Sequence, residues 1–162
     1  MRRPDERARA FRDVAILFAA AWIAGVRVSA LADQQPYPIF TADHFVIAMK
    51  TVGQAFTATN AAVTRNQTDD AKAYLAISRD RLATTITFWR DRRRDDAVTM
   101  LRTALARMDE LDAALSAERV DTDATSNLAK QIGEACEACH QTYREQDPST
   151  KKFRFRYGTE HP

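Results

Sequence analysis

Two cysteines and a histidine stand together towards the C-terminal end of the sequence, where residues 136–140 read C-E-A-C-H. Cys136 and Cys139 are the only cysteines of the chain. This C-x-x-C-H spacing is that of covalent haem attachment, because two thiols must reach the two vinyl groups on one porphyrin edge while the adjacent imidazole turns under the iron. The motif predicts one covalent haem c, attached to Cys136 and Cys139, with His140 as the proximal iron ligand.

Two other kinds of site use the same residue types. A thioredoxin-like dithiol or disulfide also has the C-x-x-C spacing, but that fold needs a β-sheet and carries the motif near its start. Structural zinc takes four Cys or His ligands, and only His44 and His161 are left to join these three residues. Nothing in their spacing is typical of a zinc site, so haem attachment is favoured over both alternatives.

The N-terminal segment has the pattern of a secretory signal peptide. A basic stretch precedes an apolar run over residues 14–26, and the small-residue sequence A-L-A follows at residues 30–32. The run is short for a bilayer span and Arg27 follows it, which favours a cleaved signal over a membrane anchor. We expect cleavage after Ala32. Because haem of this type is attached outside the bacterial cytoplasm, signal and motif both indicate the periplasm. The basic residues of the stretch are Arg2, Arg3, Arg7, Arg9 and Arg12.

The charge of the mature chain excludes one class of partner. Once residues 1–32 are removed, 18 basic and 19 acidic residues remain, for a formal net charge of −1. Nucleic-acid binding depends on Lys and Arg that neutralise phosphates, so no nucleic-acid partner is expected. The sequence shows no Ser/His/Asp arrangement, phosphate-cradling glycine loop or paired carboxylates at a pocket, which argues against an enzyme.

Helices must position the motif, because little in the mature chain interrupts them. Between Pro38 and Pro148 the sequence has no proline and only two glycines, Gly53 and Gly133, and we expect no strand. The apolar periodicity predicts four amphipathic helices, with the charged residues 91–96 between the second and the third. The helices run from Thr41 to residues 65–67, from Thr68 to Trp89, from Val98 to Leu115, and from residues 121–123 to a point before Pro148.

Four such helices with short connections predict an all-α fold, an antiparallel four-helix bundle with the haem site on the last helix. At about 100° per residue, Cys136, Cys139 and His140 fall within an arc of about 100° and share one helix face. We divide the chain into a cleaved signal peptide (1–32), a haem-binding bundle (33–147) and a basic aromatic C-terminal tail (148–162). Terminal segments of this kind are commonly disordered, and we expect the tail to be disordered or loosely packed on the bundle.

Residues 131–144 read Q-I-G-E-A-C-E-A-C-H-Q-T-Y-R, which resembles the terminal pattern G-x-x-C-x-x-C-H-x-x-Y/F-R of the cytochrome c-prime family, the class II c-type cytochromes. Residues 48–53, A-M-K-T-V-G, are similar to the segment that faces the distal side of the haem in that family. A methionine there marks six-coordinate, low-spin members, whereas high-spin members have an apolar residue such as leucine. The resemblance implies Met49 as the distal iron ligand and places Arg144 beside the proximal haem face; a solvated helix-end arginine is the alternative.

The residues alone leave the role of Met49 open. A methionine on an apolar helical stripe is more often core filler than ligand, and we expect that packing role for Met100 and Met108. His44 competes as distal ligand, but it lies about 140° around the helix from Met49 and is better explained as an exposed helix-start residue. A thioether opposite histidine raises the haem potential and leaves no open coordination site, which suits electron transfer.

The chain also departs from the family pattern. Phe45 stands where many members have an arginine, four residues before the distal position, so we expect a drier distal pocket. The connection between the second and third helices lacks the longer Phe-Pro loop, and 18 residues follow Arg144 where members usually stop soon after the motif. Gly53 and Gly133 each cost about 1 kcal/mol relative to Ala in a helix interior, which suggests close approach of the porphyrin or of another helix.

These patterns together predict a periplasmic monohaem electron carrier, with Met49 and His140 as axial ligands and redox proteins as partners. One alternative is a five-coordinate haem protein that binds nitric oxide or other small gases. Another is an interaction module whose basic aromatic tail engages a partner protein or a membrane. The resemblance also implies a homodimer through the first two helices, and we expect no stable membrane span in the mature chain.

Overall fold

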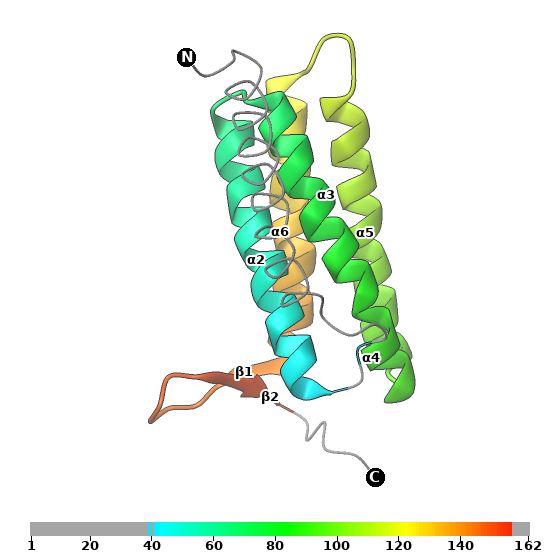
Figure 1. The fold of residues 1–162 in the computed structure, drawn as a ribbon, viewed down its shortest axis with the longest axis vertical. Helices are drawn as coiled ribbons and strands as arrows, with labels where there is room; N and C mark the ends of the chain where they lie inside the picture. The colour runs from blue at the N-terminus through cyan, green and yellow to red at the C-terminus, as the bar shows by residue number, and fades with distance from the viewer. Residues whose placement is uncertain (1–38, 40, 157–162) are drawn as a thin grey trace, which may run out of the picture. The chain divides into compact units, whose positions relative to one another are not determined.

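The computed structural model describes Ile39 and residues 41–156 (Figure 1). The chain divides into the units Met1–Gln35 and Pro36–Pro162, and the described residues belong to the second. The predicted signal peptide with its cleavage after Ala32, the end of the tail and His161 lie outside the described residues. The described part is mainly helical, which confirms the all-α class. Its helices are α2 (Ala42–Thr64), α3 (Thr68–Thr84), α4 (Ile86–Asp91), α5 (Asp95–Leu115) and α6 (Thr122–Tyr143).

The first and last predicted helices begin where the capping residues indicated. Thr41 precedes α2, and its hydroxyl accepts a hydrogen bond of 3.2 Å from the backbone N–H of His44. Asp121 precedes α6, and one of its carboxylate oxygens accepts two backbone N–H groups of the first turn, each at 3.0 Å. Both caps satisfy amides that a helix leaves without intrahelical partners, which fixes the helix start.

The second predicted helix is interrupted at Thr85, so the prediction of one helix from Thr68 to Trp89 was wrong. Thr85 is fully buried, and both its backbone N–H, at 3.0 Å, and its hydroxyl, at 2.6 Å, donate to the carbonyl of Leu82. The N–H of Phe88 then bonds to the carbonyl of Thr85. These three-residue spacings tighten the chain and separate α3 from the short α4.

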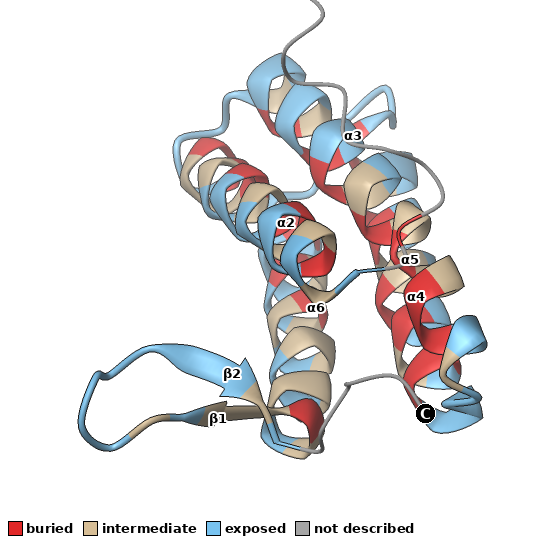
Figure 2. Cartoon of the chain, turned by 60° about the horizontal axis from the view of Figure 1, so that its bottom comes forward, coloured by how far each residue is buried: buried red, intermediate tan, exposed pale blue. Residues whose placement is uncertain are grey.

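The four long helices pack against one another: α2 contacts α3 and α6, and α5 contacts α3 and α6. Figure 2 shows that the buried residues gather on the inward faces of these helices. Burial of such large apolar side chains contributes about 1.5–3 kcal/mol each. Among the described helices, none is long and apolar enough to cross a membrane. The largest fully buried apolar side chains are Ile39, Leu75, Phe88, Trp89, Met108, Leu111 and Ile132.

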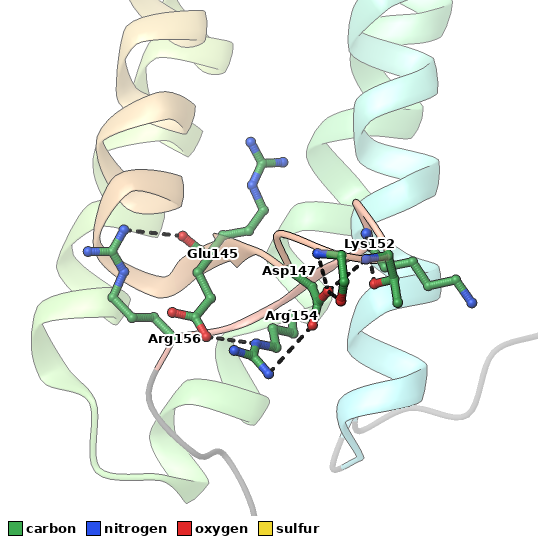
Figure 3. A network of polar contacts seen from close by, with 8 residues as sticks. Glu145, Asp147, Lys152, Arg154 and Arg156 are labelled. Carbon is green, nitrogen blue, oxygen red and sulfur yellow. Dashed lines mark hydrogen bonds and ion pairs between the residues drawn. The ribbon is translucent and has the colours of Figure 1, made fainter.

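A β-hairpin follows α6, so the expectation that no strand forms was wrong. Strand β1 (Arg144–Gln146) pairs antiparallel with β2 (Phe153–Phe155). The turn between them is organised by Asp147, whose Oδ1 accepts the backbone N–H groups of Ser149 and Thr150 at 2.9 and 2.8 Å (Figure 3). Asp and Pro in sequence favour such a turn, because the aspartate side chain bonds to the backbone two or three residues ahead.

The hairpin is fixed to the helices by an aromatic cluster. The ring of Phe155 lies 5.2 Å from Phe45, 5.5 Å from Phe88 and 6.0 Å from Trp89, measured between ring centroids. These are the separations at which aromatic rings attract one another. Described residues 148–156 of the tail therefore belong to a hairpin that packs on the helices, the second of the two arrangements predicted for the tail, and β1 pairs with β2 across the predicted boundary after residue 147.

Candidate cofactor site

The C-x-x-C-H residues lie in the last two turns of α6, where Cys136, Cys139 and His140 are partly buried. Because the helix continues to Tyr143, the angular relation predicted for Cys136, Cys139 and His140 holds, and they share one face. Both cysteines pack against the hydrophobic core, and their thiols are not joined in a disulfide. The three side chains thus combine partial burial with one common direction, as attachment to one flat cofactor requires.

The pKa values of the two thiols are shifted in the opposite direction to those of a dithiol redox site. Burial raises the pKa of the Cys136 thiol, and it raises the pKa of Cys139 to about 11, with further contributions from the charges of Cys136 and Asp96. Reactive C-x-x-C thiols have a lowered pKa and are favoured at a helix N-terminus. Here the motif is near a helix C-terminus and its thiols stay protonated at neutral pH, which argues against thiol–disulfide exchange.

His140 lies in surroundings that keep its imidazole neutral. Burial lowers the pKa of His140, and the positive charge of Arg144 lowers it further, while Glu137 opposes this. The neutral ring is the form that binds metals. Arg144 is partly buried at the start of β1, with its guanidinium 4.2 Å from the ring centre of Phe153, and is not the solvated helix-end residue of the alternative prediction.

Met49 belongs to the second turn of α2, where it is partly buried and packs against the same core as the two cysteines. The start of α2 and the end of α6 lie at the same end of the molecule's described helices (Figure 1). Trp89 links them, because its ring lies 5.2 Å from Phe45 and 4.6 Å from Tyr143. Phe45 precedes Met49 by one turn and Tyr143 follows His140 by about one turn, so the two candidate iron ligands come from the same level of neighbouring helices.

The remaining ligand candidates take packing positions. Met108 is fully buried and Met100 is partly buried against the core, which confirms the packing role predicted for both. His44 lies in the first turn of α2 and is partly buried, not exposed as predicted. Phe45 is buried in the aromatic cluster with Phe88, so an apolar ring occupies the position four residues before Met49.

The helical glycines border open space. A Cβ atom built on Gly53 or on Gly133 meets no other atom within 4 Å. Neither glycine therefore serves the close approach of another helix, and that half of the prediction was wrong. Gly133 lies one turn before Cys136 on α6, so the open space beside it lies next to the two cysteines. This opening and the donor set of two thiols and one imidazole fit a covalent haem.

Within residues 39 and 41–156, no group of three or more His, Cys, Asp or Glu side chains is placed to hold a metal ion. The zinc alternative thus has no ligand cluster among the described residues. A haem iron makes a different demand, because the porphyrin supplies four nitrogens and the protein supplies only axial ligands.

Two contributions to the site were not predicted from the sequence. One is Tyr143, whose hydroxyl donates a hydrogen bond to Asp96 of α5. The hairpin was missed although the alternation F-R-F after D-P-S-T is a strand signal after a turn signal. Comparison of the chain with protein-family models, with curated proteins and with solved structures found no match.

Proposed function

We propose that the chain is a periplasmic monohaem c-type cytochrome that transfers electrons and resembles the low-spin branch of the cytochrome c-prime family. The observation that carries this proposal is the shared, partly buried face of α6 that presents Cys136, Cys139 and His140 beside the open edge at Gly133. Signal and motif support export together, since covalent haem of this type is attached outside the bacterial cytoplasm.

The helix contacts support an antiparallel four-helix bundle as the scaffold. Each long helix contacts two of the other three, and short connections make neighbours in sequence neighbours in space. In such bundles, cofactor sites are built from side chains on facing helices. Here α6 would provide the attachment residues and α2, which contacts it, the residue on the opposite side of the cofactor.

In this proposal Cys136 and Cys139 would hold the porphyrin, and His140 and Met49 would bind the iron. The haem supplies a one-electron couple between ferric and ferrous iron. The chain sets the properties of that couple: a thioether raises the potential, and the buried apolar residues of α2 and α6 keep water away. Phe45 keeps charge out of the position one turn before Met49.

The test is to express the full chain in a bacterium with a c-type haem maturation system and to purify it from the periplasm. Mass spectrometry should show a chain that begins at Asp33 and carries one covalent haem. Each of the variants Cys136→Ser and Cys139→Ser should lose one of the two thioether bonds, so that neither carries haem attached through both. Met108→Leu, a buried control, should keep both bonds. A wild-type chain that matures in the periplasm without covalent haem would contradict the proposal.

A second candidate function is the binding of nitric oxide or another small gas to five-coordinate iron. It is favoured by one observation: Met49 is only partly buried and the exposed Gly53, one turn further along α2, borders open space. In this second function the thioether of Met49 does not bind the iron, or a gas molecule displaces it. High-spin spectra of the purified ferric and ferrous protein would support gas binding, and low-spin spectra would support electron transfer.

A homodimer through α2 and α3 is also proposed from the resemblance. Four apolar side chains on these two helices remain 40–50% exposed, which leaves them available to an interface. Sedimentation of the purified holoprotein should give twice the mass of one chain, and Ile77→Glu should give a monomer. The exposed residues are Val46, Ile47, Tyr74 and Ile77.

A further inference from the structure

The hairpin after α6 has an excess of positive charge at the surface. Residues 144–156 contain five basic and two acidic residues, whereas the mature chain as a whole is close to neutral. Lys151 and Lys152, at the hairpin turn, are exposed, and neither has an ion-pair partner among the residues that the structure describes. The hairpin is therefore a local basic surface on a chain without general basicity.

Both acidic residues of the hairpin are engaged inside it. The guanidinium of Arg154 lies 2.7 Å from a carboxylate oxygen of Glu145 and 3.9 Å from one of Asp147 (Figure 3). The backbone N–H of Thr150 and the hydroxyl and N–H of Ser149 hold the pKa of Asp147 well below its usual range. These contacts leave the lysines at the turn uncompensated.

The hairpin also exposes one aromatic side chain beside these cations. Phe153 is 57% exposed, while the ring of Phe155, two residues later in β2, lies in the aromatic cluster. The guanidinium of Arg144 lies 4.2 Å from the ring centre of Phe153. An exposed aromatic residue with arginine next to it is the composition that protein interfaces favour at their centre.

The position of the hairpin connects it to the candidate cofactor site. Its first residue, Arg144, caps α6 by donating its backbone N–H to the carbonyl of His140. The anchoring of Phe155 holds the hairpin in one arrangement, so a partner would not have to order it on binding. A protein docked on this hairpin would approach the end of α6 that carries His140.

We infer that the β-hairpin is the docking surface for an acidic redox partner protein, which contacts Phe153 at its centre and Lys151 and Lys152 at its rim. This inference rests on the proposed electron transfer. A membrane fits less well, because anionic bilayers attract clusters of 4–8 uncompensated basic residues or an amphipathic helix with a wide apolar face. The hairpin has one exposed aromatic residue and has Arg154 paired with both of its acids.

The test measures binding of the full-length holoprotein to a small blue-copper protein with a strongly acidic surface, immobilised on a biosensor at about 20 mM salt. Charge reversal in Lys151→Glu/Lys152→Glu should weaken binding about tenfold or more, and Phe153→Ala should weaken it about fivefold. The matched control Lys72→Glu/Lys130→Glu makes the same change in net charge, on α3 and in the first half of α6, and should retain most of the affinity. Equal loss in both double variants would overturn the inference, because only net charge would then matter.

Two further measurements separate the possible failures. Sedimentation with vesicles containing about 30% phosphatidylserine tests the membrane: vesicle binding that Lys151→Glu/Lys152→Glu abolishes, without any binding to the acidic protein, would overturn the inference. The biosensor detects bound mass and does not need a haem. The binding of Lys151→Glu/Lys152→Glu and of the control, each measured on a Cys136→Ser/Cys139→Ser background, therefore reports docking alone. Site-specific docking that persists there would support the surface even if the electron-transfer proposal failed.

Discussion

The hydroxyl of Tyr143 donates a hydrogen bond to a carboxylate oxygen of Asp96, and this ties the last residue of α6 to the first turn of α5. Tyr143 is buried and its ring packs on Trp89, whereas Asp96 is exposed. The bond lowers the pKa of Asp96, and burial together with this bond raises the pKa of Tyr143. It fixes the end of α6 three residues after His140, at the point where the hairpin begins.

Removal of this bond by Tyr143→Phe should lower the free energy of unfolding by about 1 kcal/mol at pH 7, because a carboxylate loses a hydrogen-bond donor while the ring stays packed. The pKa of Asp96 is lowered in the folded chain, so its contribution exists above the unfolded pKa and is lost as pH falls through the folded value. The difference between wild type and variant should therefore shrink below about pH 4. Urea unfolding from pH 7 to pH 2.5 measures it; a difference that stays constant over this range would show that the bond does not depend on the charge of Asp96.

The anchoring of the hairpin by Phe155 predicts a local effect of Phe155→Ala. The ring is partly buried among Phe45, Phe88 and Trp89, so its loss should cost about 1–2 kcal/mol, less than for a fully buried phenylalanine. Trypsin should then cleave at least tenfold faster after Lys151 and Lys152, because the hairpin opens more often. The exposed Phe153→Ala serves as control and should leave the cleavage rate within about twofold. Equal acceleration in both variants would mean that the aromatic cluster does not hold the hairpin.

The helix starts at Thr41 and Asp121 were predictable because capping is local: a side chain bonds to amides two or three residues ahead. The break at Thr85 was not, because Ile86 and Trp89 continue the apolar spacing of α3 and hide the change. What makes the break is the burial of a threonine whose hydroxyl returns to Leu82, and burial depends on neighbours distant in sequence. Periodicity records which face is apolar, not whether the backbone stays regular.

The candidate site likewise combines features that are local in sequence with features that depend on distant residues. The shared face of Cys136, Cys139 and His140 follows from spacing on a helix, so it was predictable once α6 was. The links from Trp89 to Phe45 and to Tyr143 join elements more than 40 residues apart, and no local pattern specifies them. The hairpin lies between these cases. Its turn and its alternation are local signals, but two strands of three residues are marginal alone and are stabilised by the packing of the partly buried Phe155 against the core.

The spectrum of Met49→Leu should separate the two candidate functions. If Met49 binds the iron, wild type is low-spin with a thioether charge-transfer band, and the variant loses the band, becomes high-spin and has a lower potential, because a thioether raises it. Met100→Leu changes a partly buried methionine of α5 and should leave the spectrum unchanged. High-spin spectra that are identical in wild type and Met49→Leu would exclude the Met/His pair and favour gas binding.

The open edge at Gly133 predicts opposite effects of one methyl group with and without haem. In chain made in the cytoplasm without haem, Gly133→Ala should raise the free energy of unfolding by about 0.5–1 kcal/mol, because alanine favours the helix and its Cβ meets no atom within 4 Å. In the holoprotein the methyl should meet the porphyrin, so the gain should vanish and haem content should fall. Ser126→Ala, at an exposed position in the first half of α6, should give the same small gain of about 0.5 kcal/mol in both forms. Urea unfolding and the ratio of haem to protein measure these effects. An equal gain for Gly133→Ala in both forms would show that the cofactor does not lie against this edge of α6.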